Sequence, residues 1–188
     1  MKRIILGSNS PRRRELLAGL DIDFTVDTGN TFEESQEPGV EAHDVPLHLS
    51  AGKSHGFHRP LEADEVLITS DTVVIVDREV LGKPHSREEA VAMLQKLSGR
   101  AHEVVTAVTL RDCEKEETFS VSTQVHFETL TQAEIDHYVD KYKPYDKAGA
   151  YGIQEWIGYV GISAIEGSFY NVMGFPVHRV WHELQRFL

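Results

Sequence analysis

Short apolar segments alternate along this chain with stretches in which apolar residues recur at helical spacing, a pattern that predicts an α/β protein. Strands are predicted where apolar residues cluster or alternate, at 4–6, 22–26, 66–70, 73–76, 79–81, 103–110 and 119–127. Five helices are predicted, over about 11–20 and 44–58, after the caps Ser86 and Thr131, and from Pro176 onward. Two predicted hairpins add antiparallel pairs to the parallel ones. We therefore expect a mixed sheet flanked by helices.

Composition and charge narrow the class of protein. With 188 residues, the chain can form one domain or two lobes that share a cleft, and we expect residues 1–188 to be a single domain. The net charge of −11 argues against nucleic acid and anionic membrane as partners, because both need a basic face. The single cysteine, Cys113, excludes an internal disulfide, and no apolar run is long enough to span a membrane. We expect a cytoplasmic protein.

The segment 7–17, Gly-Ser-Asn-Ser-Pro-Arg-Arg-Arg-Glu-Leu-Leu, carries the strongest chemical signal in the chain. It links the first strand to the first helix, with Ser10 as N-cap and Pro11 at the first helical position. Free backbone N–H groups and the helix dipole favour an anion there, and Ser8 and Arg13 add donors suited to phosphate. The alternative is an ordinary helix start with solvated arginines. Because the chain as a whole is acidic, this local basic segment favours a small, highly charged ligand.

Other polar residues follow predicted strands. Asp71 and Thr72 lie where a buried strand is predicted to end, and Lys83 follows the first hairpin. A carboxylate there suits a divalent metal and an ammonium suits phosphate, whereas a turn-forming Asp and a solvated Lys are the alternatives. Mg²⁺ prefers one or two carboxylates plus substrate phosphates, so Glu33 or Glu34 from an acidic loop would complete such a site.

The segment 146–154, Asp-Lys-Ala-Gly-Ala-Tyr-Gly-Ile-Gln, combines charges with very small side chains. Its small residues let the backbone approach a ligand closely, and the amide of Gln154 offers both a donor and an acceptor. The alternative is a glycine-rich surface loop.

Six segments, in order, resemble the Maf nucleotide pyrophosphatases, also called septum-formation inhibitors. They are 8–17, 70–74, 81–84, 97–106, 146–154 and 167–172, so the resemblance covers nearly the whole chain. It implies a fold like that of inosine triphosphatase, with an elongated mixed sheet, flanking helices and a central cleft between two lobes. It also implies hydrolysis of nucleoside triphosphates to the monophosphate and pyrophosphate, with a divalent cation (Mg²⁺ or Mn²⁺) as cofactor.

The resemblance assigns catalytic roles by position. Asp71 matches the proton acceptor of the family, and Lys53 and Lys83 match charged residues that act with it. Glu34 matches a further charged position and, with Asp71, is expected to hold the metal. Whether Asp71 acts as base or as metal ligand is left open, because a carboxylate bound to a metal cannot freely take up a proton.

The resemblance also assigns substrate contacts. Arg12, Thr72 and Gln154 match the positions that the family uses for base specificity, and Ser8 and Arg13 are expected to bind the substrate. A Gln after Gly-Ile is the form found in the branch that acts on dTTP and UTP. The chain departs from the common family pattern at a few positions: Glu155, Trp156, Met173 and Phe175.

These observations predict a nucleoside triphosphate pyrophosphatase acting on dTTP and UTP, with a role in clearing non-standard nucleotides. One alternative is a nucleotide-binding regulator of septum formation that does not need turnover. The others are a pyrophosphatase for a modified purine triphosphate and a metal phosphatase for monoesters. The expected partner is the nucleotide alone, without nucleic acid or membrane, and a homodimer is one possible assembly.

Overall fold

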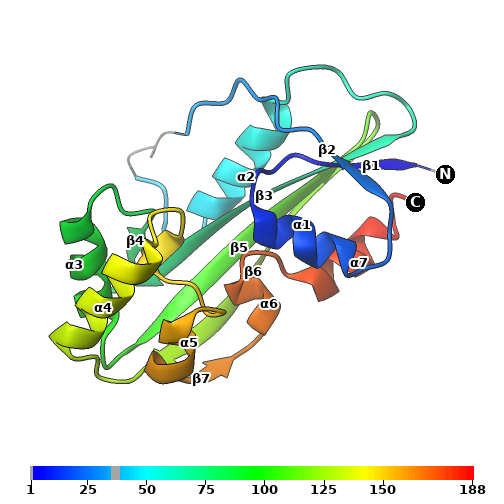
Figure 1. Cartoon of the computed structure of the whole chain (residues 1–188). Coiled ribbons are helices and arrows are strands. Elements are labelled where there is room, and N and C mark those ends of the chain that lie inside the picture. Colours follow the sequence, from blue (N-terminus) through cyan, green and yellow to red (C-terminus); the bar gives the residue numbers. More distant parts are fainter. Residues whose placement is uncertain (1, 35–38) are drawn as a thin grey trace. The chain divides into compact units, whose positions relative to one another are not determined.

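The computed structural model describes residues 2–34 and 39–188, whose strands form one seven-stranded sheet (Figure 1). The strands are β1 (Arg3–Leu6), β2 (Phe24–Val26), β3 (Glu65–Val76), β4 (Glu79–Leu81), β5 (Ala101–Arg111), β6 (Glu116–Phe127) and β7 (Ile162–Glu166). Their order is β2-β1-β3-β5-β6-β7, with β4 paired to β3. β1 runs parallel to β2 and β3, whereas β3–β4 and β6–β7 are antiparallel. The predicted mixed sheet is confirmed.

Helices flank this sheet, as predicted. They are α1 (Pro11–Ala18), α2 (Val45–His55), α3 (Arg87–Leu97), α4 (Gln132–Tyr142), α5 (Trp156–Gly161), α6 (Phe169–Val172) and α7 (Val177–Leu184), with a 3₁₀ turn, η1, at Ala148–Ala150. The sequence pattern does not predict α5, β7 or α6. These elements have six, five and four residues, which is too short for a period to show.

The course of β3 corrects the sequence prediction. The pattern predicts a strand that ends at Ser70, but β3 continues without a break to Val76. The strand continues because β4 pairs with its second half, in the register Val74↔Leu81. Asp71 and Thr72 therefore lie within the strand, and they are the two of its twelve residues that are not fully buried.

The two predicted capping boxes differ in the structure. At α4, the side chain of Thr131 accepts a hydrogen bond from the backbone N–H of Glu134, whose carboxylate accepts one in return. At α3, Ser86 caps the N–H of Glu89 in the same way. The carboxylate of Glu89 instead accepts from the backbone N–H of His85, so this box is only half formed.

Three further helix boundaries differ from the prediction. Asp44 precedes α2 but accepts no capping hydrogen bond within the described residues, because its own backbone is already helical, with φ −84° and ψ −20°. α2 ends at His55, before the predicted end near residue 58. α7 begins one residue after Pro176, whose φ of −77° and ψ of 74° are not helical.

Contacts divide the chain into two compact units. The first consists of the residues up to Thr72, of 106–121 and of 174–188. The second consists of residues 73–105 and 122–173. Strands β3, β5 and β6 contribute residues to both units.

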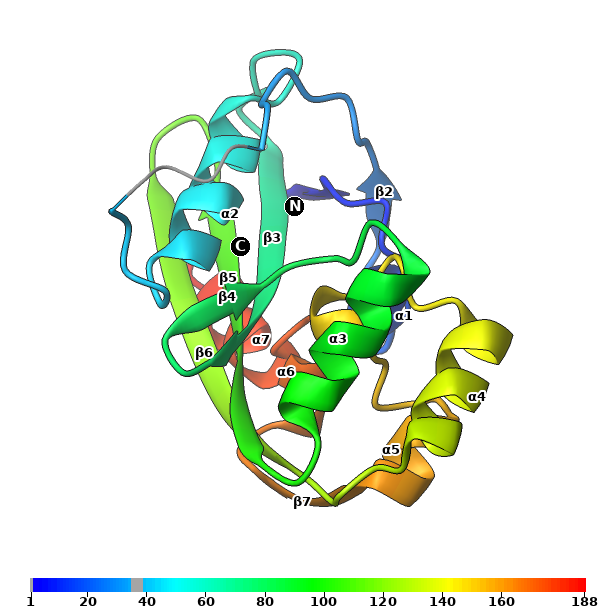
Figure 2. The ribbon, with the colours of Figure 1, turned by 90° about the vertical axis from the view of Figure 1, so that its left-hand side faces the viewer.

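In the first unit, α2 lies on one side of the strands, and α1 and α7 lie on the other (Figures 1 and 2). Buried hydroxyls join α2 to the sheet. Thr69 Oγ1 on β3 donates to the carbonyl of Ser50 over 2.8 Å, and Ser50 Oγ lies 2.9 Å from Thr109 Oγ1 on β5. Because these groups are fully buried, their hydrogen bonds fix how α2 lies on β3 and β5.

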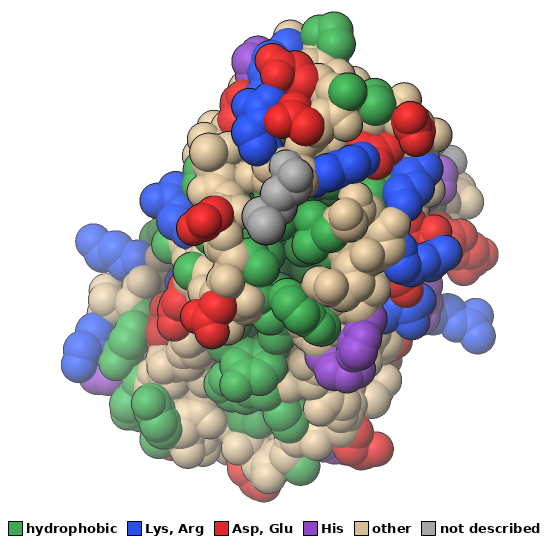
Figure 3. Space-filling model, turned by 90° about the vertical axis from the view of Figure 1, so that its right-hand side faces the viewer, with side chains coloured by type: hydrophobic (Ala, Val, Ile, Leu, Met, Phe, Trp, Pro, Cys, Tyr) green, Lys and Arg blue, Asp and Glu red, His purple; other side chains and the backbone are tan. Residues whose placement is uncertain are grey.

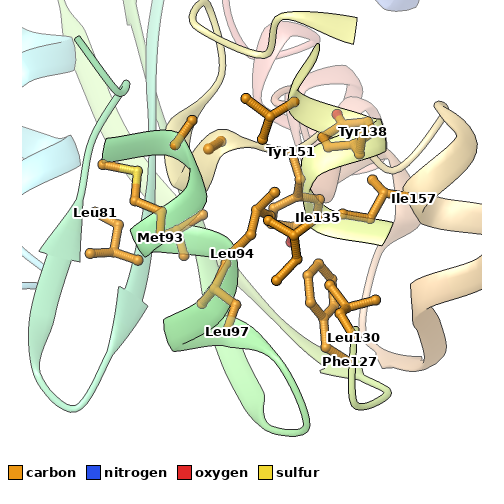
Figure 4. Packing of buried hydrophobic residues seen from close by; sticks show 14 of the residues in the cluster. Leu81, Met93, Leu94, Leu97, Phe127, Leu130, Ile135, Tyr138, Tyr151 and Ile157 are labelled. Atoms are coloured by element: carbon orange, nitrogen blue, oxygen red, sulfur yellow. The ribbon is translucent and has the colours of Figure 1, made fainter. Parts of the chain in front are cut away.

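In the second unit, α3 and α4 lie side by side over an apolar core (Figures 1, 2 and 4). Its large members come from the helices, from β6 and from the segment after η1: Met93, Leu94, Leu97, Phe127, Ile135, Tyr138, Tyr151 and Ile157. One polar group, His102, is buried among them, and its Nε2 lies 2.6 Å from the hydroxyl of Tyr151. Burial lowers the pKa of His102 to about 4, so the imidazole is neutral at pH 7.

The surface carries mixed charge on the face drawn in Figure 3. Acidic and basic side chains lie close to one another there, most plainly at the top of that view. Cys113 is exposed, in the turn between β5 and β6. Among the described residues, no helix has both the length and the apolar character needed to cross a membrane.

Candidate active site

The loop between β1 and α1 is held close to β3. Gly7 donates its N–H to the carbonyl of Ile68 over 2.8 Å, and a Cβ on Gly7 would lie only 3.0 Å from Thr69 Cγ2. Ser8 Oγ accepts from the backbone N–H of Ser10, and Ser10 Oγ in turn accepts from the N–H of Arg13. Ser10 is therefore the N-cap of α1, as predicted, and the first turn of that helix follows directly after this loop.

Arg13 ties this turn to β3 and to the segment before α7. Its Nε donates to the carbonyl of Gly174 over 2.9 Å, and its Nη1 donates to the carbonyl of Ser70, also over 2.9 Å. Further N–H groups reach Ser8 Oγ at 3.4 Å and Thr72 Oγ1 at 3.1 Å. A guanidinium has five N–H donors, so protein acceptors use most of its capacity. This geometry gives Arg13 a positioning role in addition to its charge.

Burial and the neighbouring acidic residues have opposite effects on the pKa of Arg13. Burial lowers the pKa of its guanidinium below the ordinary value, while the negative charges of Asp71 and Glu34 counter that shift. An arginine in a protein nevertheless keeps its proton. A permanent, half-buried positive charge therefore lies near the two acidic side chains.

Lys53, in the last turn of α2, bridges those acidic side chains. Its Nζ lies 2.7 Å from Asp71 Oδ1 and 2.8 Å from Glu34 Oε1. The Asp71 side chain is 13% exposed and that of Glu34 is 54% exposed, so Glu34 is the more solvent-accessible of the two carboxylates. The structure thus brings together three residues that the sequence predicts for catalysis and metal binding.

The position of Glu34 depends on two glycines: Gly52 in α2, and Gly56, which directly follows that helix. Phe32 packs so closely on the helix that a Cβ on Gly52 would lie 2.3 Å from its Cε2, and a Cβ on Gly56 would lie 2.6 Å from its Cβ. Asn30 fixes the same loop by donating from Nδ2 to the carbonyl of Lys53 over 2.6 Å. The described part of the acidic loop is therefore fitted to α2, whereas residues 35–38 lie outside the described range.

The side chains of Asp71 and Thr72 lie on opposite faces of β3. Neighbouring residues of a strand point to opposite faces, and accordingly Asp71 contacts Lys53 of α2 whereas Thr72 contacts Arg13 of α1. Pairing of β1 with β3 ends at Leu6↔Ile68, and Arg13 takes up the next free carbonyl, that of Ser70. Because β1 pairs only as far as Ile68 and β4 only from Val74 onward, this edge of β3 has no strand partner at Asp71 and Thr72 in the described residues. The carboxyl ends of parallel strands are where α/β sheets bind ligands.

The predicted residues of the second unit lie on two neighbouring segments. Lys83 is exposed after β4, and Gln154 is exposed before α5. The backbone N–H of Gly149 donates to the carbonyl of Gly82 over 3.0 Å, which joins the motif 81–84 to the motif 146–154. A Cβ on Gly149, whose φ is +70°, would lie 2.8 Å from Val74 Cγ2, so this contact requires glycine.

The donor set suits a magnesium-type ion that is completed by substrate. No group of three or more His, Cys, Asp or Glu side chains in the described ranges could hold a metal by itself. Asp71 and Glu34 both contact Lys53 Nζ, so two carboxylates lie close together, and Mg²⁺ commonly takes one or two carboxylates plus phosphate oxygens and water. These residues therefore fit the predicted cofactor. Glu33, the other predicted candidate, is exposed.

Three residues of the site are missed by the chemical argument from sequence. Thr106 on β5 lies with its Oγ1 2.9 Å from Thr72 Oγ1, and Gly174 contributes the carbonyl that Arg13 binds. Ser70 Oγ is buried without a hydrogen-bond partner within the part of the chain described. Thr106 and Ser70 lie inside segments that resemble the family, so their positions could have pointed to the site although their residue types alone do not.

Known proteins resemble this chain over nearly its whole length. The dTTP/UTP pyrophosphatase of Parabacteroides distasonis is 50% identical over 185 residues, which cover 98% of this chain and 96% of that protein. The protein of the same name from Porphyromonas gingivalis is 50% identical over 187 residues, covering 98% and 94%.

Solved structures of lower similarity include the Ham1 protein of Staphylococcus aureus. It has a TM-score of 0.49 and 15% identity over 98% of this chain and 100% of that one. A HAM1 protein from Coxiella burnetii has a TM-score of 0.46 and 14% identity, over 99% and 100%. The family model described as "Maf-like protein" matches residues 3–187. With that match and relatives half identical over nearly its full length, the chain belongs to the Maf family.

Proposed function

We propose that this protein hydrolyses dTTP and UTP to the nucleoside monophosphate and pyrophosphate. The observation that carries the proposal is the setting of Asp71, whose Oδ1 is held by Lys53 near the start of α1. Its Oδ2 accepts no hydrogen bond from the described residues and is available to a ligand or a water. Relatives that match nearly the whole chain at 50% identity are named dTTP/UTP pyrophosphatase, which supports this substrate class.

Hydrolysis requires a water to attack the α-phosphorus while the bond from that phosphorus to the bridging oxygen of pyrophosphate breaks. Asp71 is suited to take the proton of the attacking water, and Lys53 keeps that carboxylate in place. Arg12 and the N-terminus of α1 offer positive charge to the triphosphate, and Lys83 is a further cation for the leaving group. Arg13 acts mainly by fixing the loop that carries these groups.

A divalent cation, Mg²⁺ or Mn²⁺, belongs to this proposal. Glu34 would hold it, and it would neutralise the phosphate charge. Asp71 would either join Glu34 as a ligand of the cation or act as the base for the water, because a carboxylate bound to a metal cannot freely take up a proton. Lys53 holds both carboxylates in place and compensates their charge while no cation is bound, so a divalent cation that arrives with the nucleotide has to compete with its ammonium group. Gln154 is proposed to read the O4 and N3–H edge of the base.

A nucleotide panel tests the proposal. The protein is incubated with Mg²⁺ or Mn²⁺ and with dTTP, UTP, CTP, ATP, GTP or 7-methyl-GTP, and pyrophosphate and orthophosphate are measured separately. Pyrophosphate release, fastest from dTTP and UTP, is expected. Release of orthophosphate alone, or no turnover with any nucleotide, would refute it.

Asp71→Asn is the matched control for this panel, because asparagine is nearly isosteric but takes up no proton at neutral pH. It should lower turnover roughly a hundredfold or more while the melting curve is kept. Wild-type turnover in this variant would contradict the role of Asp71. Nucleotide binding without any turnover by the wild-type protein would favour the regulatory alternative.

A further inference from the structure

We propose that Glu155 is a positioning residue for recognition of the base. Its carboxylate fixes the turn that carries Gln154 and thereby keeps the Gln154 amide where it can meet the O4 and N3–H edge. The inference rests on the proposed action on dTTP and UTP, and it gives a role to a side chain that the proposed function leaves unused.

Both oxygens of the Glu155 carboxylate are bound by side chains of the second unit. Tyr138 Oη donates to Oε2, and Lys147 Nζ lies 2.9 Å from Oε1. An ionised carboxylate can only accept hydrogen bonds, and an ammonium group can only donate them. Burial and the neighbouring Glu155 raise the pKa of Tyr138, so its hydroxyl keeps the hydrogen that it donates. Glu155 is therefore the acceptor in both contacts.

The same two donors contact Gly152, two residues before Gln154. Tyr138 Oη accepts from the backbone N–H of Gly152 over 3.0 Å. Lys147 packs so closely on this residue that a Cβ on Gly152 would lie 2.8 Å from Lys147 Cε. The backbone N–H of Glu155 donates to the carbonyl of Gly152 over 3.0 Å, which closes the turn between them. The partners of the carboxylate therefore hold the turn at both of its ends.

The placement of Gln154 depends on this turn. Its side chain is exposed and makes no hydrogen bond with the described residues, so the backbone sets where the amide lies. In contrast, Tyr138 is fully buried (Figure 4), and the Lys147 side chain is only 11% exposed. Hydrogen bonds to a charged group are strong when they are shielded from water in this way. The carboxylate therefore holds the turn in one conformation before a nucleotide binds.

Glu155→Gln tests this role because a carboxamide has one acceptor oxygen and one NH₂ group. Either Tyr138 or Lys147 then loses its acceptor at this position, while the size of the side chain is kept. Lys147→Met breaks the same ion pair from its other end, and it replaces Glu155→Gln if that variant does not fold. Thr131→Ala is the control, because it removes the N-cap of α4, the helix that carries Tyr138, without touching the turn.

The affinity for the α,β-imido analogue of UTP is measured by calorimetry with Mg²⁺, so the readout does not need turnover. Each variant is made alone and together with Gln154→Ala. Glu155→Gln and Lys147→Met should each weaken binding roughly threefold to tenfold, as loss of one hydrogen bond does, and raise KM for UTP much more than they lower kcat. Combined with Gln154→Ala, neither should weaken binding further. Thr131→Ala should keep the wild-type affinity.

Wild-type affinity in both Glu155→Gln and Lys147→Met would overturn the proposal, and so would an equal loss in Thr131→Ala. A loss of the same size with and without the Gln154 side chain would also overturn it, because a purely structural role does not act through Gln154. Coupled affinities in a protein that releases no pyrophosphate would refute the proposed function alone. Pyrophosphate release from UTP without this coupling would refute the present inference alone.

Discussion

Replacing Gly52 by alanine is expected to damage the site more than the fold. The added Cβ would lie 2.3 Å from Phe32 Cε2 and 2.4 Å from its Cζ. Carbon atoms pack at about 3.5–4.0 Å, so the Phe32 ring must move by roughly 1.2 Å or more. Glu34 follows two residues later, and a similar shift would lengthen its 2.8 Å contact with Lys53 beyond hydrogen-bonding distance.

The effect on stability should be small because two terms oppose each other. Overpacking costs about 1–3 kcal/mol, and replacing a glycine inside a helix by alanine returns about 1 kcal/mol. The net loss of about 0–2 kcal/mol corresponds to a fall in Tm of at most about 8 °C for a chain of this size. A displacement near 1 Å at a catalytic group can reduce turnover by about a hundredfold, so kcat/KM should fall by tenfold to a hundredfold.

Two controls separate placement from stability. Gly19→Ala adds a Cβ that would lie 3.4 Å from the carbonyl of Leu16, an ordinary contact, and should leave kcat/KM unchanged. Ala51→Gly weakens the same helix by about 1 kcal/mol without adding an atom near Phe32. The assays are thermal unfolding and pyrophosphate release from dTTP. Wild-type kcat/KM in Gly52→Ala, or an equal loss in Ala51→Gly, would refute the argument.

Three other expectations follow from the site and the core. Lys53→Met leaves the carboxylates of Asp71 and Glu34 uncompensated, so the affinity for Mn²⁺ without nucleotide should rise several-fold while turnover falls. The affinity is measured by electron paramagnetic resonance, and weaker Mn²⁺ binding would contradict this prediction. The low pKa of buried His102, about 4, means that the unfolded chain binds more protons between pH 6.5 and 4, so about 3 kcal/mol of stability is lost as pH falls through that range. His102→Gln should flatten this pH dependence in denaturant titrations, and an unchanged slope would count against it. Gln154→Ala should lower the preference for dTTP and UTP over CTP more than it lowers turnover of the poorer substrates, whereas a uniform loss would exclude a role in base choice.

Local signals in the sequence predict most of the larger elements. Caps such as Ser10 and Thr131 act within three residues, so their helices begin where predicted. The prediction fails at Asp71, which looks like the end of a strand. The structure joins the predicted strands 66–70 and 73–76 into one strand, β3, whose second half pairs with β4, and the pattern of apolar and polar residues does not show that join.

The candidate site shows the same limit. The residue types of Asp71, Lys53 and Glu34 indicate their chemistry, and the structure places them in one cluster. The sequence does not predict that Arg13 Nε binds the carbonyl of Gly174, because these residues are 161 positions apart. The fit of Phe32 on Gly52 also depends on shape, which no pattern of apolar and polar letters records.

The first unit is built from three separate parts of the chain, so its residues are synthesised at different times. Thr72, Thr106 and Gly174, joined through the Thr72 hydroxyl, each lie at a point where the chain leaves or re-enters the first unit. A ribosome makes Asp71 and Lys53 early, but the carbonyl that anchors Arg13 emerges more than a hundred residues later. The second unit is contained within residues 73–173, so its residues are all made before that carbonyl. A nascent chain therefore carries Asp71, Lys53 and the Ser70 carbonyl early, whereas the hydrogen bond from Arg13 to Gly174 can form only near the end of synthesis.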